Sequence, residues 1–157
     1  MSHTISAEDR STAVRVLARL HRLLESVDAG LTLPQYRVLA AVAQGGVRSA
    51  RLAERLAVRR PTLTAIADGL VAAGYACRES EAGDRRVVRL YATDAGRAML
   101  SAADAAYLAR LDPLLGEIPN PECFIADLLA VGAALDARLG VDLPVPSRMT
   151  TTTEAAL

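Results

Sequence analysis

The feature that most constrains the fold is a change in the spacing of apolar residues near residue 75. Residues 49–57 and 60–73 carry apolar side chains at helical spacing, and a tight turn at 57–59 separates them. From Tyr75 onward the apolar residues alternate as in strands, and a Glu-Ala-Gly-Asp segment at 81–84 interrupts the alternation. Two short helices followed directly by a hairpin predict a helix-turn-helix with a wing, in which 60–73 is the recognition helix.

Four further segments with helical apolar spacing flank this module. Each opens with a residue that can cap a helix, and three of them are closed by glycine. The fold class is therefore predicted as mainly α with a small β-hairpin wing. With their caps and stops included, the flanking helices run over Ser6–Gly30, Thr32–Gln44, Thr93–Leu115 and Asn120–Gly140, and the hairpin strands lie near 75–79 and 86–91.

A length of 157 residues favours one domain with appended helical arms. The flanking helices are apolar along more than one face, and a second copy of the chain would cover these faces. We therefore expect a homodimer. The predicted organisation is an N-terminal dimerisation helix at 1–30, a winged helix-turn-helix at 31–92, C-terminal dimerisation helices at 93–140 and a flexible tail at 141–157.

The distribution of charge favours a nucleic-acid partner, although the net charge of the chain is zero. Residues 47–91 hold nine arginines and five acidic residues, a net charge of +4, so the remainder of the chain carries −4. A basic central module on a mildly acidic frame is typical of a DNA-binding domain joined to a dimerisation scaffold.

Several function classes lack their usual signals in this sequence. No apolar run reaches the roughly 18 residues of a membrane span, and no secretory signal is evident, so a cytoplasmic location is expected. The two cysteines, Cys77 and Cys123, have no metal-ligand spacing. Glycine-rich phosphate loops, HExxH motifs and catalytic triads are also missing. We therefore expect no enzyme, no cofactor and no bound metal.

Residues 31–100 resemble the MarR family of multiple-antibiotic-resistance regulators. The segments that carry the resemblance are, in order, LTLPQYRVLAAV, ARLAERLAVRRPTLTAIADGLVAAGY and GDRRVVRLYATDAGRAML. The resemblance implies a homodimer built from the N- and C-terminal helices, bound to a pseudo-palindromic site in double-stranded DNA. The recognition helix would read the major groove, and the wing would reach the adjacent minor groove.

The same resemblance nominates residues for contact with DNA. Asp84 and Arg86 match the wing-tip Asp-x-Arg of the family, in which the carboxylate orients an arginine that enters the minor groove. A narrow minor groove concentrates negative potential and attracts a guanidinium. Arg85 is expected to contact phosphate. Arg60, Thr62 and Thr64 match the recognition-helix positions nearest the DNA, where arginine can pair with guanine and a threonine methyl can touch thymine.

The recognition helix departs from the family pattern at three positions. Arg59 stands where the family usually has serine, so the helix lacks a hydroxyl cap, which should cost about 1 kcal/mol. Arg59 is expected to compensate by contacting phosphate. Ala65 and Gly69 replace residues that are often polar, so base-reading side chains are few, and phosphate contacts and the wing should carry more of the binding.

In the family, small aromatic or lipophilic effectors bind between the dimerisation helices and the DNA-binding lobe. By resemblance, the residues nominated for such a pocket are His21, Tyr36, Arg37 and Tyr107. Taken as ordinary residues, His21 would flank an apolar stripe, and the two tyrosines would be core or interface aromatics. The expected function is that of a transcriptional repressor, released from DNA when the effector binds.

Two alternatives to this function stay open. The first is a thiol-switched regulator, in which oxidation of Cys77 at the base of the wing moves DNA-contacting residues. The second is a winged helix that binds a protein partner, which the sparse recognition helix would suit. Steep weakening of DNA binding by salt would separate a regulator from the interaction module, because phosphate contacts release counterions.

Overall fold

The structure of the protein, a computed structural model, describes residues 5–81 and 84–138, and at residues 81 and 84–86 it describes the backbone alone. The chain divides into two compact units, residues 1–119 and residues 120–157. The predicted tail at 141–157 and the helix stop at Gly140 lie outside the described residues. The first unit contains α1 (Ala7–Glu25), α2 (Leu33–Val42), β1 (Val47–Arg48), α3 (Ser49–Arg55), α4 (Arg60–Ala72), β2 (Ala76–Glu81), β3 (Asp84–Ala92) and α5 (Asp94–Leu115), and the second contains α6 (Pro121–Arg138).

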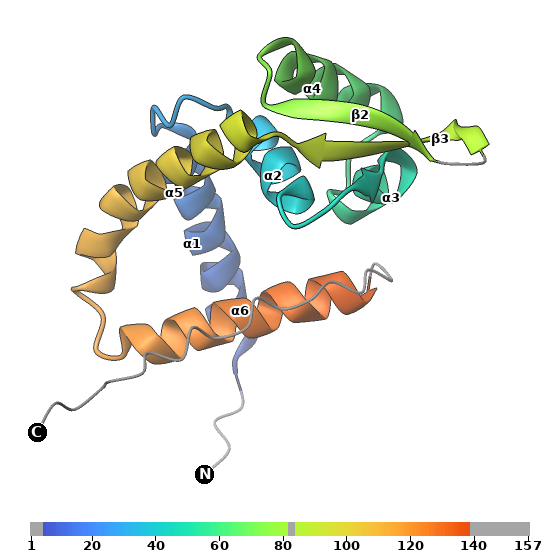
Figure 1. The fold of residues 1–157 in the computed structure, drawn as a ribbon. Coiled ribbons are helices and arrows are strands. Elements are labelled where there is room, and N and C mark those ends of the chain that lie inside the picture. The colour runs from blue at the N-terminus through green and yellow to red at the C-terminus, as the bar shows by residue number, and fades with distance from the viewer. Residues whose placement is uncertain (1–4, 82–83, 139–157) are drawn as a thin grey trace, which may run out of the picture. The chain divides into compact units, whose positions relative to one another are not determined.

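The architecture confirms the predicted fold class. Helices make up most of the described chain, and the strands form one small antiparallel sheet in the order β1-β3-β2. Figure 1 shows β2 and β3 beside α4 and α3, so that the sheet projects as a wing next to the helix-turn-helix.

Helix starts follow the capping residues identified in the sequence. Ser6 accepts a hydrogen bond from the Asp9 amide at 3.0 Å, and the Asp9 carboxylate accepts from the Ser6 amide in return. Thr32 and Gln35 form the same reciprocal box at the start of α2. Thr93 accepts from the Gly96 amide at 3.0 Å to open α5. Each cap satisfies an amide that the first helical turn would otherwise leave unpaired.

The first helix ends earlier than the sequence predicted. α1 stops at Glu25, because the Ser26 amide and hydroxyl bond back to carbonyls of the last turn, including that of Leu23 at 2.7 Å. Gly30, the predicted stop, lies in the following turn with φ of +71°. Its amide is 3.4 Å from the Asp28 carboxylate. Such side-chain bonds offer the backbone a local alternative to the helix.

The sheet also differs from its prediction. β1 pairs Val47 with Leu90 and Arg48 with Arg89, and this two-residue strand is too short to have a recognisable alternation in sequence. Both wing strands extend closer to the hairpin than expected, to Glu81 in β2 and from Asp84 in β3, with a shift of register between Ser80 and Glu81. Alternation identified the wing but not its full length.

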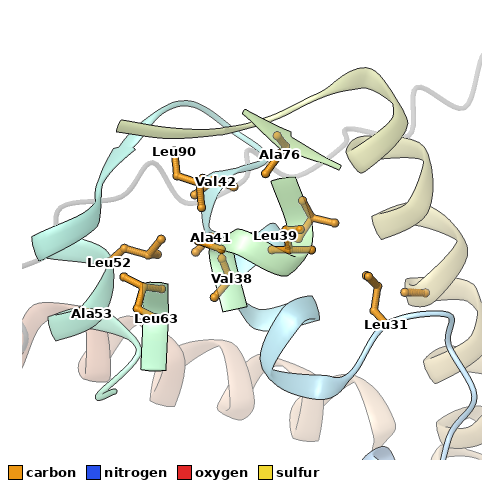
Figure 2. Packing of buried hydrophobic residues seen from close by; sticks show 14 of the residues in the cluster. Leu31, Val38, Leu39, Ala41, Val42, Leu52, Ala53, Leu63, Ala76 and Leu90 are labelled. Atoms are coloured by element: carbon orange, nitrogen blue, oxygen red, sulfur yellow. The ribbon is translucent and has the colours of Figure 1, made fainter. Parts of the chain in front are cut away.

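The hydrophobic core of the first unit is centred on α2. Figure 2 shows Val38, Leu39 and Val42 among leucines from α3, α4 and β3. Ala103 and Tyr107 join α5 to this core. The largest fully buried side chains are Leu39, Leu52, Leu70, Leu90, Val38 and Val42. One core therefore fixes the recognition helix and the wing on the same support.

Helices α1 and α6, both described along their whole length, contain no buried residue. Within the described ranges, no helix combines the length and hydrophobicity that crossing a bilayer requires.

Candidate DNA interface

The turn between α3 and α4 sets the start of the recognition helix. Leu56 is the C-cap of α3, and Ala57 adopts a left-handed conformation with φ of +52°, unusual for a residue with a side chain. The helix expected to run to Ala57 therefore ends two residues earlier. Arg59 occupies the N-cap of α4 and makes no side-chain capping bond, as the sequence predicted.

The predicted DNA-reading residues of α4 all lie on exposed surface. Arg59, Arg60 and Thr62 are exposed near the N-terminal end of the helix. Thr64 is exposed too, but its hydroxyl donates to the carbonyl of Arg60 at 3.0 Å, so its methyl group is the part left for a thymine. The opposite side of α4 carries Leu63, Ala67 and Leu70, which are buried.

One row of α4 faces the wing across an open cavity of about 600 Å³. Arg60, Thr64 and Asp68 stand at four-residue intervals along this row and line one wall. The residues that line the other walls are Arg48 of β1, Ser49, Ala50 and Leu52 of α3, and Arg78, Val87, Val88 and Leu90 of the wing. The wing and the recognition helix are therefore neighbours, but side chains do not fill the space between them.

A charged contact bridges α4 and the wing. The Arg78 guanidinium lies 2.6 Å from the Asp68 carboxylate, joining β2 to the third turn of α4. Neither residue is among those predicted from the sequence to contact DNA. The available signal was that Asp68 is the one acidic residue among residues 60–72, in a helix expected to approach phosphates.

The predicted wing-tip residues begin strand β3. Asp84 pairs with Glu81 across the hairpin, and Arg85 and Arg86 follow it in the same strand. The side chains of these three residues lie outside the described part of the structure, so their role in DNA contact stays a prediction. The backbone does place them at the end of the wing farthest from the core residue Leu90.

The residues nominated for an effector pocket fall into separate environments. Tyr36 and Tyr107 pack edge to face, with ring centroids 4.8 Å apart. The Tyr36 hydroxyl donates to the Asp104 carboxylate at 2.6 Å. Burial, and then this hydrogen bond, raise the pKa of Tyr36 above its ordinary range, and burial raises that of Tyr107. The pair ties α2 to α5.

Arg37 and His21 have other partners. The Arg37 guanidinium donates to the carbonyl of Leu56 at 2.9 Å, at the end of α3. His21 is largely exposed on α1 and lies 3.3 Å from Glu25, one turn further along the same helix. A separate open cavity of about 280 Å³ is lined by Ser26, Val27, Ala106, Ala109 and Arg110. The effector site on the four nominated residues stays a prediction.

Large apolar side chains are exposed on the two outer helices. The exposed fraction reaches 65% for Val14 and 67% for Leu129. A solvated surface seldom carries such a concentration of apolar groups. The exposed set comprises Val14, Val16 and Leu17 on α1 and Phe124, Ile125, Leu128, Leu129, Val131 and Leu135 on α6.

The cysteines are both free thiols. Cys77 is half-buried in β2, and Cys123 is exposed in the first turn of α6. Among the residues that the structure describes, no group of histidine, cysteine or acidic side chains has the arrangement of a metal site.

Known proteins share this sequence pattern and this architecture. Residues 29–87 match the MarR family in sequence. No curated protein sequence matches the chain. A MarR-family transcriptional regulator from Rhodococcus sp. RHA1 has a similar structure, with a TM-score of 0.70 and 20% identity, over 88% of this chain and 96% of that one.

Two similar structures contain a bound small molecule. CouR from Rhodococcus jostii RHA1, solved with p-coumaroyl-CoA, has a TM-score of 0.67 and 20% identity, over 92% of this chain and 100% of that one. The PcaV transcriptional regulator from Streptomyces coelicolor, solved with its natural ligand, has a TM-score of 0.62 and 25% identity, over 85% of this chain and 98% of that one. The sequence match spans the helix-turn-helix and reaches into the wing, and the fold agrees along most of the chain. Residues 29–87 of this chain are therefore similar in sequence to the MarR family, and the chain has the winged-helix fold of MarR-family regulators.

Proposed function

We propose that the protein is a homodimeric transcriptional regulator that binds a pseudo-palindromic DNA site and releases it when a small effector binds. The observation that carries the proposal is that one core supports both the exposed start of α4 and the wing hairpin, whose sequence contains Arg85 and Arg86. Arg59, Arg60 and Thr62 are exposed at the start of α4, while Arg85 and Arg86 begin strand β3. Helix starts with arginines suit phosphate and base-edge contacts.

The dimer is supported by the apolar surfaces of the outer helices. Neither α1 nor α6, each fully described, contributes a buried residue to the chain. Pairing with a second copy would bury the side chains of Leu17 and Leu129, which are more than half exposed. A two-fold dimer would also present two recognition helices to two half-sites.

The effector proposal rests on the family and on the Tyr36–Tyr107 pair. CouR and PcaV were each solved with a small molecule. In this chain the two tyrosines join α2 of the DNA-binding lobe to α5. An aromatic or lipophilic molecule that binds beside them, with Arg37 and His21 at its edges, would favour one arrangement of these helices over another. DNA affinity would then change by the difference in effector affinity between the two arrangements.

Repression is the proposed outcome of DNA binding, because a dimer seated on a promoter blocks polymerase without further contacts. A role on chromosomal DNA would place the protein in the cytoplasm. The half-buried position of Cys77 gives no particular support to the thiol-switch alternative.

The test is selection of duplexes from a random library by wild type and by Arg86→Ala. We expect wild type to enrich a palindromic sequence, with two chains bound per duplex, and Arg86→Ala to bind that sequence more weakly. Arg138→Ala, on α6 away from the helix-turn-helix in sequence, serves as the matched charge control. Enrichment of no sequence by wild type would contradict the proposal and favour the protein-interaction alternative.

A further inference from the structure

The recognition helix carries one acidic side chain on its exposed surface. Residues 60–72 contain one basic residue, Arg60, and one acidic residue, Asp68. An exposed carboxylate on a helix that approaches DNA repels the phosphates, unless a cation neutralises it. The contacts of Asp68 therefore bear directly on how the protein meets a duplex.

Asp68 has its cationic partner on the wing. The Asp68 Oδ1 and an Arg78 terminal nitrogen are 2.6 Å apart, which is hydrogen-bonding distance for a charged pair. The two side chains come from different elements, α4 and β2, which the turn around Gly74 connects. The contact therefore fixes a distance between two elements, unlike an ion pair within one helix.

The surroundings of the pair explain why such a contact matters. Beside it lies the open cavity of about 600 Å³ between the α4 row and the wing strands. Val87 and Val88, on the wing side of this cavity, are only half-buried. Because apolar packing does not fill this space, it holds the wing strands at Val87 and Val88 less tightly against α4 than a packed core would.

The pair contributes little to the stability of the fold. The Asp68 side chain is 58% exposed and that of Arg78 is 36% exposed. Ion pairs at such exposed positions typically add little to the free energy of unfolding, because water screens them. A contact of this kind can nevertheless select one wing position among several of similar energy.

We propose that the Asp68–Arg78 pair positions the wing against the recognition helix, so that both elements enter their grooves together. Asp68 and Arg78 are positioning residues, which act through the wing-tip residues and α4. The pair also cancels the repulsion between the Asp68 carboxylate and phosphate. This inference rests on the proposed DNA binding. It adds Asp68 and Arg78 to the residues on which DNA affinity depends, although neither is expected to contact DNA itself.

A charge swap tests the inference in the full-length protein. The variants are Asp68→Arg, Arg78→Asp and the double variant D68R/R78D, measured on the duplex that wild type enriches. Asp94→Arg is the matched control, because it makes the same charge change at an exposed ion pair within one helix, between Asp94 and Arg97 of α5. Thermal unfolding of each variant reports whether the fold is intact.

Each single variant should bind DNA about tenfold more weakly than wild type. A loss of this size lies within the range of coupling energies found for contacting residues. This loss should occur in Asp68→Arg even though the substitution raises the net charge of each chain by two. The double variant restores the ion pair with its charges exchanged, so it should bind to within about threefold of wild type. If the two substitutions acted independently, their losses of affinity would add instead. Hydroxyl-radical footprints of the single variants should lose minor-groove protection at the flanks and keep protection at the recognition-helix sites. Asp94→Arg should bind at least as tightly as wild type.

Three results would overturn the inference. One is that Asp68→Arg binds as tightly as wild type or more tightly, which would make Asp68 a simple source of repulsion. Another is that the double variant binds no better than the weaker single variant, which would make Arg78 a direct phosphate contact. The third is an unchanged footprint in both single variants. Failure of wild type to enrich any duplex would instead remove the proposed function, and this inference with it.

Discussion

Replacing Tyr36 with phenylalanine tests the contact between α2 of the DNA-binding lobe and α5. The change keeps the ring and its edge-to-face contact with Tyr107, whose centroid lies 4.8 Å away. It removes the hydroxyl that donates to Asp104 at 2.6 Å. The Asp104 carboxylate is then left half-buried without this donor.

The cost follows from the type of hydrogen bond. A bond to a charged acceptor contributes roughly 1.5–3 kcal/mol, and partial exposure of this pair places the value near the lower end. For a chain of this size, each kcal/mol corresponds to roughly 2–4 °C in melting temperature. We therefore expect Tyr36→Phe to melt about 3–6 °C below wild type at neutral pH.

The pH dependence gives the same variant a second readout. The folded pKa of Tyr36 is raised above its unfolded value of about 10 by burial and the bond to Asp104. Above pH of about 10 the unfolded chain loses the Tyr36 proton while the folded chain keeps it, so this stabilisation falls as pH rises. Phenylalanine has no such proton, and the difference between wild type and Tyr36→Phe should shrink from pH 8 toward roughly pH 11.

Calorimetry or circular dichroism at several pH values measures both effects. Tyr75→Phe is the matched control, because it removes the same hydroxyl from a half-buried tyrosine for which the described residues supply no side-chain partner. A melting temperature for Tyr36→Phe within about 1 °C of wild type would refute the assigned bond strength. A difference that does not change with pH would refute the proton linkage.

Four further predictions concern stability, DNA binding and assembly. Gly96→Ala should destabilise the fold by about 2 kcal/mol or more, because the new Cβ would lie 1.9 Å from the Tyr75 carbonyl oxygen. Gly69→Ala should instead stabilise it by about 1 kcal/mol, since its Cβ would meet only Gln35 at 3.5 Å, and chemical denaturation compares the two. Arg59→Ser should raise stability by about 1 kcal/mol by capping α4, while weakening DNA binding; equal or tighter binding would remove Arg59 from the interface. Leu17→Glu should dissociate the dimer in sedimentation velocity, whereas Arg15→Glu should not, and an intact Leu17→Glu dimer would exclude that face of α1.

Much of the fold could be predicted because local signals and tertiary packing agree. Ser6, Thr32 and Thr93 cap helices where the sequence places them, and α5 has its predicted bounds. The failures occurred where local bonding or pairing overrides periodicity. Ser26 ends α1 before its apolar stripe ends. Strand β1 exists only through its pairing with β3, and two residues carry no pattern.

The candidate site was predictable in outline but not in its contacts. The exposure of Arg59, Arg60 and Thr62 follows from the helical periodicity of α4. The Asp68–Arg78 contact depends on how the wing folds back beside α4, which no local pattern encodes. Likewise, only the structure reveals that Arg37 bonds to the carbonyl of Leu56. Contacts between side chains of different elements depend on the tertiary structure, so the spacing of residues within one helix or strand cannot predict them.

The most direct test of wing-dependent DNA binding is the salt dependence of affinity for the enriched duplex, for wild type and for Arg86→Ala. A dimer that makes about 6–10 phosphate contacts should show a steep fall of affinity with salt. Arg86, expected in the minor groove, lies in the negative potential of the flanking phosphates and displaces counterions there. Because a dimer has two wings, Arg86→Ala should reduce the slope of log affinity against log salt by about 2. A shallow wild-type slope, or one that Arg86→Ala leaves unchanged, would contradict the account.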